Sequence, residues 1–321
     1  MIGKICGTGS YAPKLVWDNH KLAQMVDTSD EWIRERTGVA RRHIVGEAET
    51  TADLASKAAS AALADAGMSA EEIDLIVVAT ISPGSIMPST SCEVQKKIGA
   101  VHATCFDLNA ACTGFLFALN TAQAYIGQGL YQTALVIGAE SLSHLTNWKD
   151  RSTCVLFGDG AGAVILKETE DGKYAQVTHS VGAKGDVLTL TSRNQPAYEE
   201  GVAAPETYMQ MDGKEVFKFA VSSVPEAIRQ LLDKEGMDVG QISYYLLHQA
   251  NARIVVSVAK RLKEDIRKFP MNMKEYGNTS SASIPILLDE MNKRGMLVRG
   301  QYIVLSGFGA GLSYGASLIQ W

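Results

Sequence analysis

The sequence predicts a layered α/β fold built from two similar halves. The duplication rests on two matches at one spacing. GMSAEEIDLIVVAT, from Gly67, is similar to GMDVGQISYYLLHQ, from Gly236, and QTALVIG, from Gln132, is similar to QYIVLSG, from Gln301; the members of each pair lie 169 positions apart. Two independent matches at one offset indicate internal repetition. Within each half, apolar strand-like segments alternate with helical ones, which is typical of α/β proteins with buried sheets.

The offset also defines the halves and their equivalent positions. A polar turn, KETEDGK, lies near the middle of the chain. We therefore expect an N-terminal half over residues 1–170 and a C-terminal half over 171–321. The same offset places Cys112 opposite Ser281, and so NAAC opposite NTSS.

Capping residues mark several helix ends. A helix is predicted over 52–66, between the threonines that end at Thr51 and a stop at Gly67. Capping boxes are predicted at Ser69–Glu72 and at Thr28–Glu31, because a hydroxyl residue followed three positions later by Glu satisfies two unpaired backbone donors.

Composition excludes several classes of function. The chain has 321 residues, 46% of them hydrophobic, and a net charge of −5 without a basic tail, so bulk binding to nucleic acid or to anionic lipid is not expected. The apolar run at the N-terminus is too short for a signal peptide, and no later segment reads as a membrane span. We expect a cytoplasmic protein with neither nucleic acid nor membrane as a partner.

The cysteines fit neither a disulfide framework nor a zinc site. Their number is odd and no C-x-x-C pair occurs among Cys6, Cys92, Cys105, Cys112 and Cys154. The histidines other than His248 show no ligand spacing, so no metal site is expected.

Cys112 is distinguished by its surroundings, DLNAACTGFLFAL. The helix predicted after it is apolar on nearly all sides, which indicates central burial. A cysteine at the start of such a helix lies near unpaired N–H groups and the positive end of the helix dipole, which favour a thiolate. Small neighbours allow a substrate to approach closely. The position therefore predicts a nucleophile.

Two polar residues of the second half are candidate partners. His248 follows an apolar strand in SYYLLHQANARIV, and Asn278 lies on a loop before a helix in YGNTSSASIP. The repeat places that loop opposite the loop of Cys112. If the halves pack about a pseudo-two-fold axis, the three side chains converge.

These segments resemble a known family. DLNAACTGF, LLHQANARI, YGNTSSASIPILLDE, DRSTCVLFGDGAGA, DTSDEWIRERTG and SGFGAGLSYGA are similar, in order and spacing, to motifs of the β-ketoacyl-[acyl-carrier-protein] synthase III family of bacterial fatty acid synthesis. The resemblance covers nearly the whole chain. It implies the thiolase-like fold, a duplicated five-layered αβαβα arrangement. It also separates the chain from elongating ketoacyl synthases, expected to carry Cys/His/His, and from hydroxymethylglutaryl-CoA synthases, expected to use a Glu.

The resemblance implies a role for each residue of the Cys/His/Asn set. Cys112 would accept a short acyl group from acyl-CoA. His248 and Asn278 would hydrogen-bond the thioester oxygen of malonyl-acyl carrier protein while it loses CO₂, and the condensation would give β-ketoacyl-acyl carrier protein. The backbone N–H groups of Cys112 and Ala310 would form the oxyanion hole. The family commonly has three glycines where this chain has Gly-Ala-Gly, so Ala310 fits only if it needs no left-handed conformation.

Binding residues are carried over by the same resemblance. Trp32 and Arg151 would clamp the adenine of coenzyme A between them, and further coenzyme contacts would come from Arg36, Gly213 and Asn251. An exposed basic group would dock the acidic carrier protein, and it consists of Lys218, Arg253, Lys260 and Arg261. The acyl pocket would contain Leu142, Phe157 and Met87, the last from the partner subunit of a homodimer. Methionine is adaptable, so primers larger than acetyl, including branched ones, are a hypothesis.

Other functions stay open at this point. The same fold serves specialised polyketide or quinolone-like pathways, and a non-catalytic partner subunit is a further alternative that retention of all three residues disfavours. Cys/His/Asn also occurs in proteases, but the duplicated α/β pattern does not resemble papain-like order. The resemblance implies no permanently bound cofactor, with acyl-CoA as a substrate.

Overall fold

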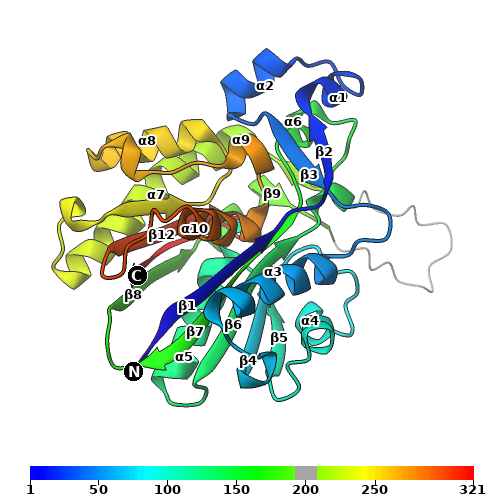
Figure 1. Ribbon diagram of the computed structural model, residues 1–321. Coiled ribbons are helices and arrows are strands. Elements are labelled where there is room, and N and C mark those ends of the chain that lie inside the picture. Colours follow the sequence, from blue (N-terminus) through cyan, green and yellow to red (C-terminus); the bar gives the residue numbers. More distant parts are fainter. Residues whose placement is uncertain (192–207) are drawn as a thin grey trace.

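Two β-sheets stack face to face, with helices between them and on both outer sides (Figure 1). The computed structural model describes residues 1–191 and 208–321. The first sheet has the order β1-β7-β6-β4-β5, formed by β1 (Ile2–Tyr11), β7 (Gly160–Thr169), β6 (Thr133–Glu140), β4 (Leu75–Ala79) and β5 (Thr104–Leu108). The second has the order β11-β12-β13-β8, formed by β11 (Tyr244–Leu247), β12 (Tyr302–Gly309), β13 (Ser313–Gln320) and β8 (Tyr174–Ser180).

Parallel pairing at one side of each sheet determines where the strand-end loops meet. β4 runs parallel to both β5 and β6, and β11 runs parallel to β12. The remaining pairs of the two sheets are antiparallel. Because the carboxyl ends of parallel strands share one edge, the loops after β5 and β11 are available to line a common site.

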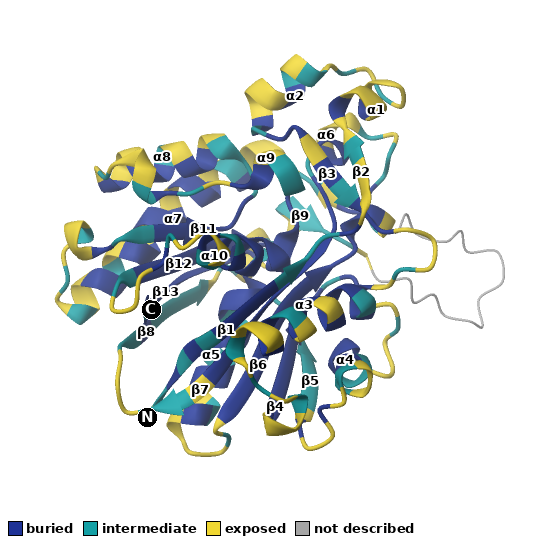
Figure 2. Cartoon of the chain, viewed as in Figure 1, coloured by how far each residue is buried: buried dark blue, intermediate teal, exposed yellow. Residues whose placement is uncertain are grey.

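The elements form five layers, α, β, α, β and α, which are held together by three apolar cores. This arrangement confirms the predicted αβαβα fold. The outer layer on the first sheet is α3 (Thr51–Ala66) with α4 (Thr90–Ile98), the central layer is α5 (Gly114–Gly127) with α10 (Ser283–Lys293), and the other outer layer is α7 (Gly213–Glu235) with α8 (Ala252–Leu262). The central core contains side chains from both sheets, such as Val77 and Leu305 around Leu116. Figure 2 shows this burial concentrated in the strands and inner helices. The apolar α5 is thus a central helix, as predicted.

A smaller group of elements lies at one end of the molecule. It contains β2 (Leu15–Asp18), α1 (Asn19–Ala23), α2 (Asp30–Thr37), β3 (Arg41–Ile44) and α6 (Arg151–Cys154). Near it are α9 (Met273–Tyr276) and the short pair β9 (Leu188–Thr189) and β10 (Gln210–Met211). The 3₁₀ turns are η1 (Ala70–Glu72), η2 (Ala111–Thr113), η3 (Leu142–His144), η4 (Gly182–Val187), η5 (Val239–Gln241), η6 (Ile266–Lys268) and η7 (Ser280–Ala282). No helix within the described ranges is long and apolar enough to cross a bilayer.

The offset of 169 residues recurs in the structure. β4 and β11, β6 and β12, η2 and η7, and α5 and α10 each begin that distance apart. Even the unusual backbone is repeated, because Ala111 has φ 46° and Ser280, its equivalent, has φ 48°. We propose that residues 1–170 and 171–321 are the two repeated units, since β7 ends at Thr169 and β8 begins at Tyr174.

One of the two predicted capping boxes is confirmed, and the helix predicted over 52–66 begins one residue earlier, at Thr51. Thr50 caps α3 in a box with Asp53, and the helix ends at the left-handed Gly67. Ser69–Glu72 also forms a box. The box predicted at Thr28–Glu31 is wrong: α2 begins one residue later, after Ser29, whose hydroxyl accepts from the Trp32 N–H. Both hydroxyls could serve in TSDEW, and Ser29 is the one in position to accept.

Candidate active site

Cys112 lies at the junction of β5 and α5, in contact with the second half. It belongs to η2, the turn that leads into α5, so it precedes the helix rather than standing inside it. The end of β12 packs against its backbone. A Cβ at Gly309 would lie 2.8 Å from the Cys112 nitrogen and 3.0 Å from its Cβ. Only glycine leaves room for this close approach.

The environment of the thiol differs from the expected one. The pKa of Cys112 is raised to about 12, chiefly by burial; the Ser280 hydroxyl acts to lower it and the nearby Glu140 acts to raise it. The helix terminus was expected to favour the thiolate, but removal from water acts in the opposite direction and the net shift of the pKa is upward.

His248 follows β11 and is almost fully buried. Its Nδ1 lies 2.7 Å from the Ser283 hydroxyl, which also accepts from the Gln249 N–H at 3.3 Å. Burial lowers the pKa of His248 to about 3, so the ring is neutral at physiological pH. A neutral ring held at Nδ1 leaves Nε2 available to a substrate.

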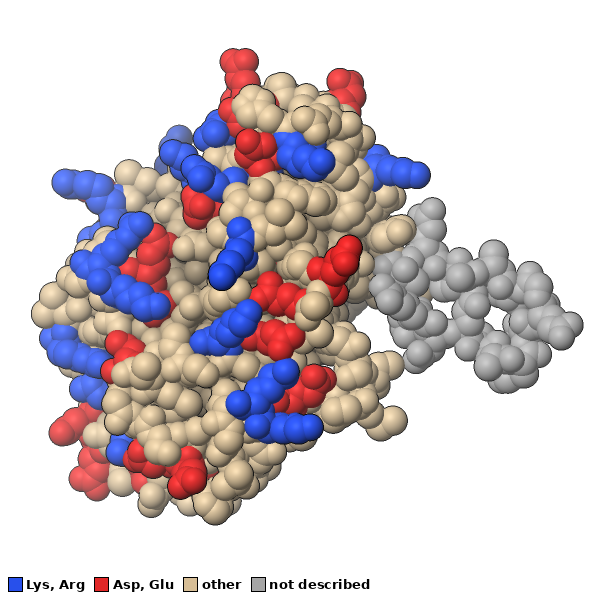
Figure 3. Space-filling view, turned by 45° about the vertical axis from the view of Figure 1, so that its right-hand side comes forward, with Lys and Arg blue, Asp and Glu red and all other residues tan. Residues whose placement is uncertain are grey.

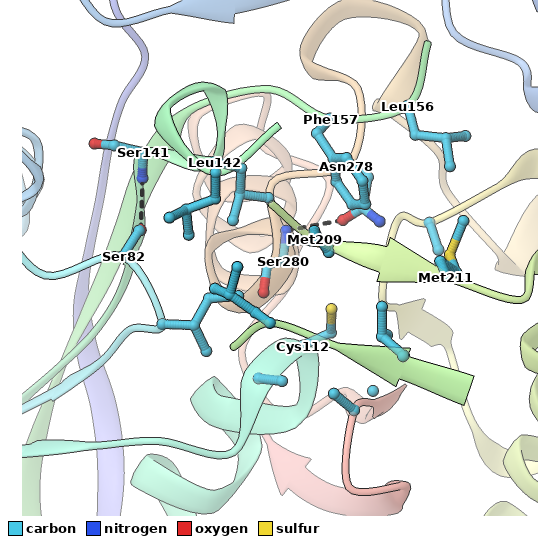
Figure 4. Close-up of a pocket in the computed structure, with 18 of the residues that line it drawn as sticks. Ser82, Cys112, Ser141, Leu142, Leu156, Phe157, Met209, Met211, Asn278 and Ser280 are labelled. Carbon is cyan, nitrogen blue, oxygen red and sulfur yellow. Dashed lines mark hydrogen bonds between the residues drawn. The ribbon is translucent and has the colours of Figure 1, made fainter. Parts of the chain in front are cut away.

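Asn278 is fixed by its own loop. Its Oδ1 accepts from the Ser280 N–H at 2.9 Å, which leaves the amide NH₂ group free of that bond (Figure 4). Its backbone N–H donates to Leu156 O at 2.8 Å, and its carbonyl accepts from the Gly158 N–H. The equivalent Asn109 makes the same kind of turn, with Oδ1 accepting from the Ala111 N–H. The amide orientation thus follows from a turn that both halves share.

One cavity of about 1110 Å³ brings most predicted residues together. Its lining includes Cys112, His248, Asn278, Ala310, Leu142, Phe157, Trp32, Arg36, Gly213 and Asn251. Met87 does not line it and is 85% exposed. This exposure is that of a single chain. The proposed contact of Met87 with the acyl pocket of a partner subunit therefore stays a prediction.

Ala310 does not need a left-handed backbone conformation, which was the condition for its place in the oxyanion hole. Its φ is not in the left-handed region, whereas the next residue, Gly311, has φ 138°. The alanine in Gly-Ala-Gly is therefore compatible with the backbone, because glycine occupies the position that needs it.

Trp32 and Arg151 are together but not as a spaced clamp. The Arg151 guanidinium carbon lies 4.7 Å from the centroid of the Trp32 ring, and Nη1 donates to Asp27 O at 2.8 Å. A base between the two would need roughly twice the ~3.5 Å contact distance. Without a base, the cation rests on the indole face itself. The predicted clamp therefore requires one of the two side chains to move, and it stays a prediction.

The predicted docking residues are exposed. Lys218 pairs with Glu215 at 2.6 Å, and the Arg253 guanidinium lies 5.6 Å from the Phe217 ring centroid. Lys260 and Arg261 lie in the last turn of α8. The face shown in Figure 3 carries both signs of charge interspersed. Docking by this group stays a prediction.

Sequence reasoning missed several residues of the cavity. Met209 packs with Leu142 and Phe157 in one apolar cluster, yet its short segment has no periodicity that indicates a lining role. Ser280 lines the cavity and Ser283 contacts His248, and both lie within the motif NTSSAS, whose density of hydroxyls was the available signal. Within residues 1–191 and 208–321, no group of three His, Cys, Asp or Glu could hold a metal ion.

The fold and the site together define a class. A partly buried cysteine, a neutral histidine and an asparagine amide line one cavity of a thiolase-like fold. Such a site is typical of condensing enzymes, which hold an acyl group on the thiol and stabilise an enolate with neutral donors.

Comparison with known proteins identifies the family. The model for "3-Oxoacyl-[acyl-carrier-protein (ACP)] synthase III" matches residues 106–185, and the model for its C-terminal part matches residues 232–321. The β-ketoacyl-[acyl-carrier-protein] synthase III of Clostridium acetobutylicum is 49% identical over 99% of this chain and 98% of its own, and that of Clostridium perfringens is 48% identical over the same shares. The chain belongs to the β-ketoacyl-[acyl-carrier-protein] synthase III family, whose members are condensing enzymes of the acyltransferase class.

Solved structures agree. The 3-oxoacyl-[acyl-carrier-protein] synthase III from Aquifex aeolicus has a TM-score of 0.93 at 43% identity, covering 99% of this chain and all of that one. A priming β-ketosynthase of the R1128 polyketide pathway has a TM-score of 0.94 at 34% identity, covering 99% of this chain and 96% of that one. The fold is therefore shared by both classes of pathway, and the identity to the Aquifex aeolicus enzyme is higher than the identity to the R1128 enzyme.

Proposed function

We propose that this protein catalyses the first condensation of bacterial fatty acid synthesis. It transfers an acyl group from acyl-CoA to Cys112 and condenses it with malonyl-acyl carrier protein to give β-ketoacyl-acyl carrier protein. The observation that carries the proposal is the convergence of Cys112, His248 and Asn278 on one cavity. The family and the full-length relatives support the same activity.

In the first step, the Cys112 sulfur attacks the acyl carbon and the coenzyme sulfur leaves. The thiol proton ends on the departing coenzyme A, so one thioester replaces another. The N–H groups of Cys112 and Ala310 would stabilise the oxyanion that forms between bond making and bond breaking. The space that coenzyme A leaves then admits the malonyl group.

In the second step, His248 Nε2–H and the Asn278 amide donate to the malonyl thioester oxygen. CO₂ leaves, the enolate carbon attacks the acyl group, and the Cys112 thiolate departs. Neutral His248 can donate from Nε2 only if Nδ1 is an acceptor. We propose that Ser283, 2.7 Å away, donates to Nδ1 and thereby selects this tautomer.

Acyl-CoA and malonyl-acyl carrier protein are therefore the proposed substrates, and no cofactor is bound permanently. Trp32, Arg36, Arg151, Gly213 and Asn251 are proposed to bind coenzyme A. The exposed group Lys218, Arg253, Lys260 and Arg261 is proposed to attract the acidic carrier protein. A homodimer is proposed, in which Met87 of one subunit completes the acyl pocket of the other.

We expect primers larger than acetyl to be accepted. The apolar wall formed by Leu142, Phe157 and Met209 contains a flexible methionine rather than a second rigid ring. The test is β-ketoacyl-carrier protein formation from malonyl-carrier protein with acetyl-, butyryl- or isobutyryl-CoA, measured by mass spectrometry. Turnover of butyryl- or isobutyryl-CoA at rates near that of acetyl-CoA is the expected result, and turnover of acetyl-CoA alone would remove the larger-primer proposal.

A specialised pathway is the second candidate, because the R1128 priming β-ketosynthase shares the fold at 34% identity. The same experiment separates the two. Product with a fatty acid carrier protein supports the first function. Product only with a carrier protein of another pathway supports the second.

A further inference from the structure

Ser280 has a buried hydroxyl that no protein group uses. The residue is 1% exposed, it lines the cavity, and its Oγ has no hydrogen-bond partner among the described residues. Buried hydroxyls are normally paired, and an unpaired one is costly. The backbone holds the residue at φ 48°, in a turn that packs against the turn of Cys112. The hydroxyl is therefore fixed beside the nucleophile at a cost to the fold.

The polar neighbours of this hydroxyl are the Cys112 sulfur and the Glu140 carboxylate. Figure 4 shows the Ser280 oxygen and the Cys112 sulfur on the same side of the cavity. The carboxylate of Glu140 already accepts from four donors, of which Thr80 Oγ1, the Ile81 N–H and Ser82 Oγ bind Oε2 and Ser281 Oγ binds Oε1. A carboxylate has about four acceptor sites. The Ser280 proton therefore has two possible acceptors, Glu140 Oε1 and the Cys112 sulfur, and the sulfur becomes the stronger one when it carries the negative charge.

We propose that the Ser280 hydroxyl donates a hydrogen bond to the Cys112 sulfur when it is a thiolate. The thiolate exists twice in the proposed reaction, when the sulfur attacks acyl-CoA and when it leaves after condensation. The bond is absent from the neutral thiol, so it favours the charged form. The inference rests on Cys112 as the nucleophile of the proposed function.

The backbone of the first half shows which substitution is safe. Ala111 takes φ 46° at the position equivalent to Ser280, so Ser280→Ala removes the hydroxyl and keeps a side chain that this turn accepts. Ser280→Gly is a second variant without any Cβ strain. Ser281→Ala is the matched control, because its hydroxyl is buried in the same turn but faces Ala79 O and Glu140.

The test is the rate of Cys112 alkylation by iodoacetamide against pH, followed by intact mass. The titratable groups that face the thiol are Glu140 and His248, and they are unchanged in all variants. We expect Ser280→Ala and Ser280→Gly to slow alkylation on the order of tenfold at each pH below the thiol's pKa, so that their profiles are displaced to higher pH. Ser281→Ala removes a hydrogen bond to Glu140 and none to the sulfur, so it is expected to show no displacement to higher pH.

Superimposed profiles of wild type and both Ser280 variants would overturn the proposal, and so would an equal displacement in Ser281→Ala. The measurement uses no acyl-CoA. Failure of the proposed function therefore shows in condensation assays, whereas failure of the Ser280 inference shows only in alkylation.

Discussion

His248→Ala and Asn278→Asp are expected to lose malonyl decarboxylation while Cys112 still becomes acylated. Both residues donate to the malonyl thioester oxygen in the proposed second step and to nothing in the first. Loss of one preorganised donor costs about 100- to 1000-fold in rate, so CO₂ release from malonyl-carrier protein should fall by that factor. Acylation by acyl-CoA should stay close to wild type.

Asn278→Asp is the sharper of the two variants. The carboxylate keeps the acceptor that binds the Ser280 N–H at 2.9 Å, and so keeps the turn, but it replaces the amide donor with a second acceptor. The two half-reactions are measured separately, as ¹⁴CO₂ release and as acyl-enzyme mass. Equal loss of both in either variant would contradict the assigned roles.

Gly309→Ala is expected to abolish most acylation of Cys112. The new Cβ would lie 2.8 Å from the Cys112 nitrogen and 3.2 Å from its Cα, so the backbone of the nucleophile must move. A displacement of about 1 Å in an active site can cost on the order of 100-fold in rate. The acyl-enzyme rate with acetyl-CoA measures the effect.

Gly307→Ala is the matched control on the same strand. Its Cβ would meet its nearest atom, Leu116 Cδ1, at 3.4 Å and His248 Cβ at 3.6 Å, which are ordinary contacts. It should keep most of the acylation rate. Thermal melting of both variants separates a local shift from unfolding. If Gly309→Ala acylates as fast as Gly307→Ala, the close packing at Cys112 has no functional consequence.

Much of the fold was predictable because the sequence contains an internal repeat, so the same pattern of elements occurs twice. The 169-residue offset placed the loop of Asn278 opposite the loop of Cys112, and the structure repeats even their turns. The cap of α3 was predictable because Thr50, Asp53 and Gly67 act within one helix. Signals of this kind are local or repeated, so they can be read from sequence.

Other features depend on how side chains meet across the fold. The pKa of Cys112 is raised to about 12 by burial that the helix pattern alone does not measure. The Arg151 guanidinium carbon lies 4.7 Å from the centroid of the Trp32 ring. This stacking depends on side-chain rotations that the sequence does not specify. Met209 packs with Leu142 and Phe157 in the wall of the cavity, although its segment has no periodicity that predicts this position. The cap of α2 was misplaced because Thr28 and Ser29 offer the same hydroxyl one residue apart.

The central claim is that Cys112 carries the acyl group. The most direct measurement is the intact mass of the wild type and of Cys112→Ala after incubation with acetyl-CoA. One acetyl adduct per chain in the wild type, absent from Cys112→Ala, is the predicted result. An adduct that persists in Cys112→Ala, or no adduct in the wild type with acetyl-, butyryl- or isobutyryl-CoA, would contradict it.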